Sequence, residues 1–323
     1  MTTRNFCTLF DSNYLLKGVA MLRSLFKYCP EAQVHLLCMD EQTREVITAL
    51  FPDIVCISLA DVEDAALLEA KKDRSVAEYC WTLSPVLPSY VLANNPGISM
   101  LTYVDADLLF YSPVQPLFDE IGDASIAIIE HRFTPRLQHL EVNGRFCVEW
   151  VSFRRDEEGM ACLARWREQC VEWCYYRLED DRMGDQKYLD AWPARYPSTH
   201  ILLHSGAGIA PWNYAQYSFG QFADGTQTVN GAPLIFYHFH QFQLLDNGKF
   251  DRLSAFYTSE CPEPAAVYDA YEAALGAAVL EVRRIRPGFR AGMKPAAGVA
   301  GRRWVQRFLP RPVKEALRRL LRL

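Results

Sequence analysis

Hydrophobic and polar positions alternate along the first half of the chain in blocks that predict strands and helices in turn. Short apolar runs bounded by turn residues indicate buried strands, and apolar residues three or four apart indicate helices that cover a sheet. The predicted strands are residues 6–10, 34–39, 54–59 and 98–104; the predicted helices are 15–28, 41–51, 62–72 and 78–93, the last broken by Pro85 and Pro88. This order predicts a mostly parallel central sheet with helices on both faces.

The second half of the chain has a more mixed pattern. Strands are predicted at residues 125–130, 145–153, 201–203 and 234–239, and a long helix at 157–178. Residues 287–301 are rich in Gly, Ala and Pro, a composition typical of linkers. We therefore expect one α/β domain over residues 1–286, a linker over 287–301 and a separate tail over 302–323.

Charge is distributed unevenly along the 323 residues. The net charge is -5, yet residues 282–323 hold thirteen basic residues and one acid, whereas the rest holds 21 basic and 38 acidic residues. The tail also carries Trp304 and several leucines, the composition of a helix that lies on anionic lipid. We expect it to meet an anionic membrane surface. Docking on the acidic body and nucleic-acid binding are the alternatives, and we expect no nucleic-acid partner.

The cysteines and the lack of long apolar runs indicate in which cellular compartment the protein folds. The ten cysteines lie in apolar or helical contexts without a Cys-x-x-Cys pair, which favours reduced, buried thiols. The sequence contains no secretory signal pattern and no apolar run near the ~18 residues that span a bilayer. A folded chain that is 50% hydrophobic and 13% aromatic suits an enzyme. We expect a cytoplasmic protein, peripheral at the inner membrane face through its tail.

Two carboxylates, Asp105 and Asp107, follow the apolar strand at 98–104. If the chain stays extended beyond Val104, side chains two apart face the same way and converge. Neighbouring carboxylates repel unless a proton or a cation lies between them. Hard oxygen ligands favour Mg²⁺ or Mn²⁺, which usually share their site with substrate phosphates. The alternative is a strand end with solvated acids.

Three further motifs accompany this Tyr-Val-Asp-Ala-Asp segment. They are Thr-Leu-Phe-Asp-Ser-Asn-Tyr at residues 8–14, Gly-Asp-Gln-Lys-Tyr-Leu at 184–189 and Tyr-His-Phe-His at 237–240. Together, over residues 5–250, they resemble the nucleotide-sugar domain of GT-A glycosyltransferases, especially glycosyltransferase family 8 and its bacterial surface-polysaccharide relatives. The resemblance implies a GT-A type α/β fold and a hexosyltransferase-type enzyme. It implies metal-dependent transfer from a nucleotide-sugar donor, a UDP-sugar, to a carbohydrate or lipid-linked acceptor, with retention, in polysaccharide or lipopolysaccharide assembly.

The resemblance also assigns roles to single residues. It implies a nucleoside site at Asp11, Asn13 and Tyr14, a Mn²⁺ (or Mg²⁺) site at Asp105, Asp107 and His238, and a catalytic pair Asp185 and Gln186 beside the anomeric carbon. Asp105 would also touch the ribose. Lys249 is a candidate diphosphate partner, although its spacing from the histidines differs from the His-x-x-Gly-x-x-Lys pattern of the family. Trp212, Asn213 and His240 would contact the acceptor or sugar. Helix capping is the alternative for Asp11, Asn13 and Asp185, and His240 competes with His238 for the metal.

Departures from the family pattern leave competing functions open. Residues 146–150 read Phe-Cys-Val-Glu-Trp where many members carry Asn and Gly, and Trp81 stands where family 8 often has Arg. A sugar-phosphate nucleotidyltransferase is one alternative, but residues 5–20 offer only Lys17 and Gly18 toward its Gly-rich, basic triphosphate loop. The other is a catalytically silent, membrane-attached protein that binds nucleotide sugars.

Overall fold

The fold of the chain was taken from a computed structural model that describes residues 3–254, 256–257 and 261–296. Within this part, seven strands form the central sheet, in the order β3-β2-β1-β4-β7-β6-β8. They are β1 (Arg4–Phe10), β2 (Ala32–Cys38), β3 (Val55–Ser58), β4 (Met100–Val104), β6 (Ile126–Glu130), β7 (Phe146–Arg154) and β8 (Thr199–Leu202). Only β7 runs antiparallel to its neighbours, β4 and β6, in this described sheet. The predicted mostly parallel sheet is confirmed.

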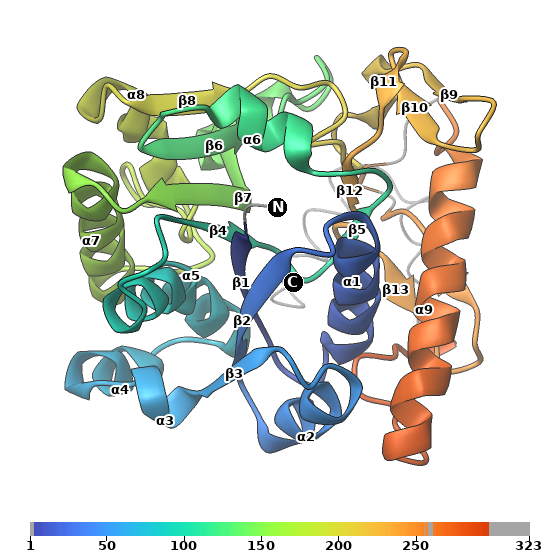
Figure 1. Cartoon of the computed structure of the whole chain (residues 1–323), viewed down its shortest axis with the longest axis horizontal. Helices are drawn as coiled ribbons and strands as arrows, with labels where there is room; N and C mark the ends of the chain where they lie inside the picture. The colour runs from blue at the N-terminus through green and yellow to red at the C-terminus, as the bar shows by residue number, and fades with distance from the viewer. Residues whose placement is uncertain (1–2, 255, 258–260, 297–323) are drawn as a thin grey trace, which may run out of the picture.

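Helices cover both faces of this sheet (Figure 1). One face carries α1 (Leu15–Tyr28), α2 (Glu41–Leu50), α6 (Gln115–Ile121) and α9 (Ala265–Ile285); the other carries α3 (Leu59–Val62), α4 (Ala65–Lys71), α5 (Val76–Asn94), α7 (Glu157–Glu172) and α8 (Trp192–Arg195). Alternation along β1 explains the two layers, because Phe6 and Phe10 enter one apolar core while Cys7 and Leu9 enter the other.

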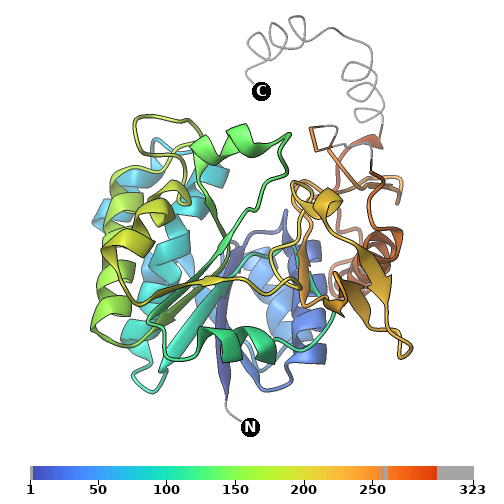
Figure 2. The same cartoon turned by 90° about the horizontal axis from the view of Figure 1, so that it is seen from above.

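Short strands extend the fold on the side of α1 and α9 (Figures 1 and 2). They are β5 (Leu108–Phe110) with β12 (Phe236–His238), β9 (Phe219–Gln221) with β10 (Gln227–Val229) and β11 (Ala232–Pro233), and β13 (Gln243–Leu244) with β14 (Phe250–Asp251). An ion pair of 2.6 Å between Arg23 and Glu281 joins α1 to α9. The sequence analysis did not predict α9, which buries a helical stripe from Val267 to Val282.

Helix α5 departs from the sequence-based prediction, because it runs unbroken through Pro85 and Pro88. Each proline removes one helical hydrogen bond and costs about 3 kcal/mol. Against this, α5 buries Leu83, Leu87 and Val91 among other side chains between the sheet and α7. Burial of each large apolar side chain contributes roughly 1.5–3 kcal/mol, so packing outweighs the two prolines. The prediction of a broken helix was wrong.

Two other helix boundaries also differ. The helix predicted at 62–72 is two helices, because a Ser58–Asp61 capping box starts α3 and Asp64 accepts from the Leu67 N–H to start α4. The helix predicted at 157–178 ends at Glu172. By contrast, the helix predicted at 15–28 has the bounds of α1.

The C-terminal part of the chain is described only as far as residue 296. Residues 287–296, part of the predicted linker, lie against the domain. Phe289 is buried, and Lys294 forms backbone hydrogen bonds with Leu244 and Asp246. The predicted tail, residues 302–323, lies outside the described residues. Among the helices that are described, none is both long enough and apolar enough to cross a membrane.

Candidate functional site

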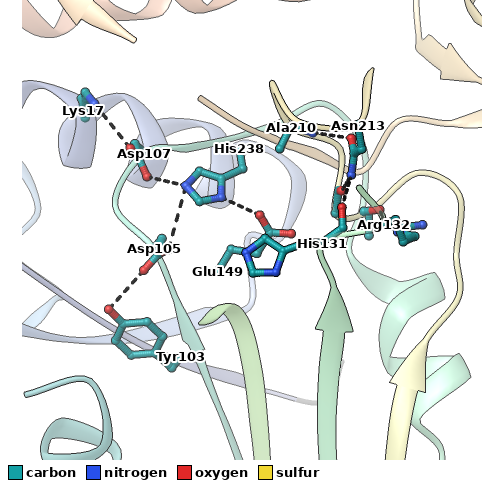
Figure 3. Close-up of polar contacts among 12 residues, drawn as sticks. Lys17, Tyr103, Asp105, Asp107, His131, Arg132, Glu149, Ala210, Asn213 and His238 are labelled. Atoms are coloured by element: carbon teal, nitrogen blue, oxygen red, sulfur yellow. Dashed lines mark hydrogen bonds and ion pairs between the residues drawn. The ribbon is translucent and has the colours of Figure 1, made fainter. Parts of the chain in front are cut away.

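Asp105 and Asp107 lie in the turn between β4 and β5, at the carboxyl end of the parallel strands (Figure 3). Pairing of β5 with β12 sets Leu108 opposite His238, and the Phe239 N–H donates to the Asp107 carbonyl at 2.9 Å. The strand pairing therefore brings His238 to the carboxylates. The chain turns at residues 106–107 and does not stay extended, yet the two carboxylates approach one imidazole.

The three side chains form a compact set of ligand atoms. His238 Nε2 lies 3.1 Å from Asp107 Oδ1 and 4.0 Å from Asp105 Oδ2, and one atom from each residue lies within 4.8 Å of the others. Asp107 and His238 are buried, whereas Asp105 is partly open to solvent. Two carboxylates and one imidazole fit a divalent ion, and the nitrogen favours Mn²⁺ over Mg²⁺. Asp105, Asp107 and His238 would hold that ion.

Burial and neighbouring charges set the protonation of the two carboxylates differently. Burial opposes ionisation of Asp107, but Lys17 and His238 outweigh it and hold its pKa well below the usual range. For Asp105, burial raises the pKa to about 7; His238 opposes this rise, and the charges of Asp107 and Glu149 add to it. The site therefore contains one firmly ionised carboxylate and one that titrates near neutral pH.

Glu149, to which the sequence analysis gave no role, contacts two of the proposed ligands, His238 and Asp105. Its side chain on β7 is fully buried, and Oε2 accepts from His238 Nδ1 at 2.6 Å. Its backbone carbonyl accepts from the Asp105 N–H at 3.2 Å, and Oε1 has no partner among the described residues. Cys147 joins Glu149 and His238 in a second group of possible ligands. An acid inside the apolar run 146–153 was the sequence signal for this position.

These contacts also set the protonation and the orientation of the His238 imidazole. Burial alone would lower its pKa, but Asp107, Cys147 and Glu149 raise the pKa well above the usual value. A carboxylate on Nδ1 directs Nε2 toward the Asp105–Asp107 pair, as second carboxylates do for many metal-bound histidines.

Asp185 and Gln186 lie after α7, just before the short helix η2 (Lys187–Ala191). Asp185 is buried; burial raises its pKa to about 7, Ser84 opposes the rise, and the charge of Asp105 adds to it. Gln186 Nε2 donates to the Asn143 carbonyl at 3.0 Å. No side chain caps η2 at Gln186.

Asp11 and Asn13 make local contacts at the start of α1. The Asp11 carboxylate accepts from the Asn13 N–H at 2.9 Å, from Asn13 Nδ2 at 2.8 Å and from the Tyr14 N–H at 3.2 Å. These contacts form a local turn ahead of the helix, whereas Tyr14, the N-cap of α1, makes no side-chain capping hydrogen bond. The Tyr14 ring differs, because it is 45% exposed beside Asp105 and Asp107 and open to a ligand.

Trp212 and Asn213 lie in a buried loop beside His238. The Trp212 ring centroid is 5.2 Å from that of His238 and 5.5 Å from that of His240. Asn213 is fully buried, accepts from the Ala210 N–H and donates to the His131 carbonyl (Figure 3). Its amide also donates to Gly208, so it holds the loop in place.

His240 lies beside His238 but outside the group of ligand atoms, and Lys249 lies farther along the chain. Burial and the positive charge of His238 together lower the pKa of His240 to about 3; the centres of the two imidazole rings are 5.7 Å apart. In the described residues the imidazole grouped with Asp105 and Asp107 is that of His238. Lys249 lies in the exposed turn between β13 and β14, and within the described chain it forms no ion pair with these carboxylates.

Comparison with solved structures defines the fold class. An active-site mutant of LgtC matches with a TM-score of 0.53 and 15% identity, over 84% of this chain and 95% of that chain. The apo form of the glycosyltransferase GlyE from Streptococcus pneumoniae TIGR4 matches with a TM-score of 0.50 and 13% identity, over 87% of this chain and 64% of that chain. The chain therefore has the GT-A fold, which confirms the predicted fold class.

Sequence relatives define the family within that class. No family model matches the chain. YfnF of Bacillus subtilis (strain 168), described as an uncharacterized protein, is 30% identical over 298 residues, which are 89% of this chain and 96% of the relative. YfnD of the same organism, described in the same way, is 29% identical over 310 residues, 95% of this chain and 99% of the relative. The chain belongs to the family of YfnF.

Proposed function

We propose that the chain is a metal-dependent glycosyltransferase that moves a sugar from a nucleotide-diphosphate donor, a UDP-sugar, to a carbohydrate or lipid-linked acceptor. The observation that carries the proposal is the approach of Asp105, Asp107 and His238 at the carboxyl edge of the sheet of a GT-A fold. Ligands of α/β sheets bind at this edge. The glycosyltransferase names of LgtC and GlyE agree with this function.

Each part of the donor then has a proposed partner. A divalent ion held by Asp105, Asp107 and His238 would supply charge neutralisation to the departing diphosphate. The exposed Tyr14 ring would stack on the base, and the turn at Asp11 and Asn13 would meet the nucleoside edge. Trp212 and His240 would line the sugar or acceptor side. Asn213 would shape that wall through its loop, and Lys249 stays a candidate diphosphate partner.

Asp185 and Gln186 would act at the anomeric carbon in a retaining transfer. The Gln186 amide oxygen would stabilise positive charge that develops on the sugar, and Asp185 would bind hydroxyls. Because such contacts strengthen only in the transition state, Gln186→Ala should lower kcat by about 100-fold or more with little change in the donor KM. Steady-state donor hydrolysis with Mn²⁺ measures both constants. Near wild-type turnover would remove Gln186 from the mechanism.

Two alternatives predict different outcomes. A sugar-phosphate nucleotidyltransferase would release pyrophosphate from a nucleoside triphosphate, and a silent binding protein would bind the donor without hydrolysing it. Asp185 is buried and its pKa is raised to about 7, with a contribution from the charge of Asp105, which favours an active site over a silent one. We further propose that the acceptor belongs to surface-polysaccharide or lipopolysaccharide assembly and that the tail holds the enzyme at the membrane.

Thermal unfolding tests the metal and donor site. A ligand that binds only the folded chain raises Tm by mass action. We expect UDP, CDP or GDP to raise the wild-type Tm only when Mn²⁺ is present, and Asp107→Ala to lose that rise while still folding. Asp53→Ala, an exposed acid in another loop, is the matched control. An equal rise in wild type and Asp107→Ala would refute the metal assignment.

A further inference from the structure

Lys17 is a cation already present at the candidate metal site. It is the third residue of α1, and its Nζ lies 3.4 Å from Asp107 Oδ2 (Figure 3). The side chain is 16% exposed, and its ammonium lies 4.7 Å above the centre of the Tyr14 ring. Lys17 therefore lies between the aromatic ring proposed to hold the base and the carboxylates proposed to hold the metal.

Lys17 neutralises part of the negative charge at the candidate metal site. Asp107 is paired on both oxygens, with His238 Nε2 at 3.1 Å on Oδ1 and Lys17 Nζ at 3.4 Å on Oδ2. A divalent ion on Asp105, Asp107 and His238 would neutralise the two carboxylates. The Lys17 ammonium would then be largely buried beside a carboxylate whose charge the metal already offsets, which is costly. An anion bound next to the metal removes that cost.

We propose that Lys17 binds the diphosphate of the nucleotide donor. The inference rests on the proposed function and adds to it the residue that recognises the phosphates. Lysine suits this task because it acts as a compact point charge toward phosphate oxygens. Lys249, the candidate from sequence, lies in an exposed turn and forms no ion pair with the site carboxylates in the described chain. The competing explanation is that Lys17 serves only as the counter-ion of Asp107.

The test compares Lys17→Met, which keeps most of the aliphatic stem, with Lys27→Met. Lys27 is an exposed lysine of the same helix whose ammonium also lies 4.7 Å above a tyrosine ring, that of Tyr28. Titration calorimetry measures three ligands: Mn²⁺ alone, then UDP, CDP or GDP in saturating Mn²⁺, and the matching nucleoside. Circular dichroism and Tm establish that each variant is folded.

Loss of a hydrogen bond to a charged group should weaken the nucleoside diphosphate about 10- to 100-fold in Lys17→Met. We expect unchanged nucleoside affinity, unchanged or tighter Mn²⁺ binding, partial recovery in Lys17→Arg and wild-type behaviour in Lys27→Met. Weakening of Mn²⁺ as large as that of the diphosphate would show that Lys17 positions the metal ligand Asp107 and would overturn the inference. Unchanged diphosphate affinity would leave Lys17 as the counter-ion of Asp107 and would overturn the inference as well. A wild type that binds no nucleoside diphosphate with Mn²⁺ would overturn the proposed function itself.

Discussion

Four side chains of alternating charge run through the candidate site. Glu149 contacts His238 at 2.6 Å, His238 contacts Asp107 at 3.1 Å, and Asp107 contacts Lys17 at 3.4 Å. Each ion therefore has an opposite charge beside it, which offsets the cost of burying it. These contacts hold Asp107 and His238 in place before any ion binds, so metal binding would lose little free energy to ordering their side chains.

Glu149 acts through His238, and its removal should therefore affect metal binding more than the fold. We expect Glu149→Ala to weaken Mn²⁺ about 10- to 100-fold, the usual effect of losing the carboxylate behind a metal-bound histidine. Glu149→Gln keeps an acceptor oxygen for Nδ1 and should lose less. Electron paramagnetic resonance of free Mn²⁺ gives the dissociation constants. Equal Mn²⁺ affinity in Glu149→Ala and wild type would contradict this role.

At the scale of elements, strand pairing and capping decide how the site is assembled. The β5–β12 pair is three residues long on each strand, yet it brings His238 from more than a hundred residues away to Asp107. The segment after α9 approaches the loop at residues 11–14. A side chain on Gly292 would come within 2.0 Å of the Asn13 carbonyl, so the absence of a Cβ allows this contact. The loop at residues 11–14, near the start of the sequence, therefore packs against the segment at Gly292, near its end.

In α5, tertiary packing outweighs the local sequence signals that predict a break in the helix. Its two prolines are strong breaking signals, yet its Ser75–Glu78 capping box and its buried face keep it continuous. Ser89 Oγ also donates to the Pro85 carbonyl at 2.8 Å within this segment. Local propensity is a weak prior where an element lies between a sheet and a second helix.

At the scale of the whole molecule, the uneven charge bears on the membrane proposal. The tail, residues 302–323, has eight basic residues and one acid, and each basic residue near an anionic surface contributes on the order of 1 kcal/mol, less at high salt. We expect deletion of residues 302–323 to abolish co-sedimentation with phosphatidylserine vesicles and to spare turnover on a soluble acceptor. Sedimentation at 50 and 500 mM salt measures the electrostatic share. Undiminished vesicle binding by the truncated chain would exclude the tail as the anchor.

The sequence by itself determined the order of the elements in the first half of the chain, the mostly parallel sheet and the acidic pair Asp105 and Asp107. These follow from local information, apolar runs and turn residues, whereas His238 was a candidate only through the resemblance to a known family. The same information predicted α1 to the residue. The resemblance favoured His238 as the metal ligand, but His240 stayed a competitor, because residues two apart share a strand face.

Only the tertiary structure decided which residues meet. The pairing register of β5 and β12 places His238 beside Asp107. The position of Glu149 on β7 places its carboxylate against that histidine, and the first turn of α1 places Lys17 against Asp107. Packing likewise keeps α5 intact through two prolines. The physical reason is the same in each case: long-range pairing and burial are properties of segments distant in sequence, and their energies exceed the local preferences that a sequence pattern reports.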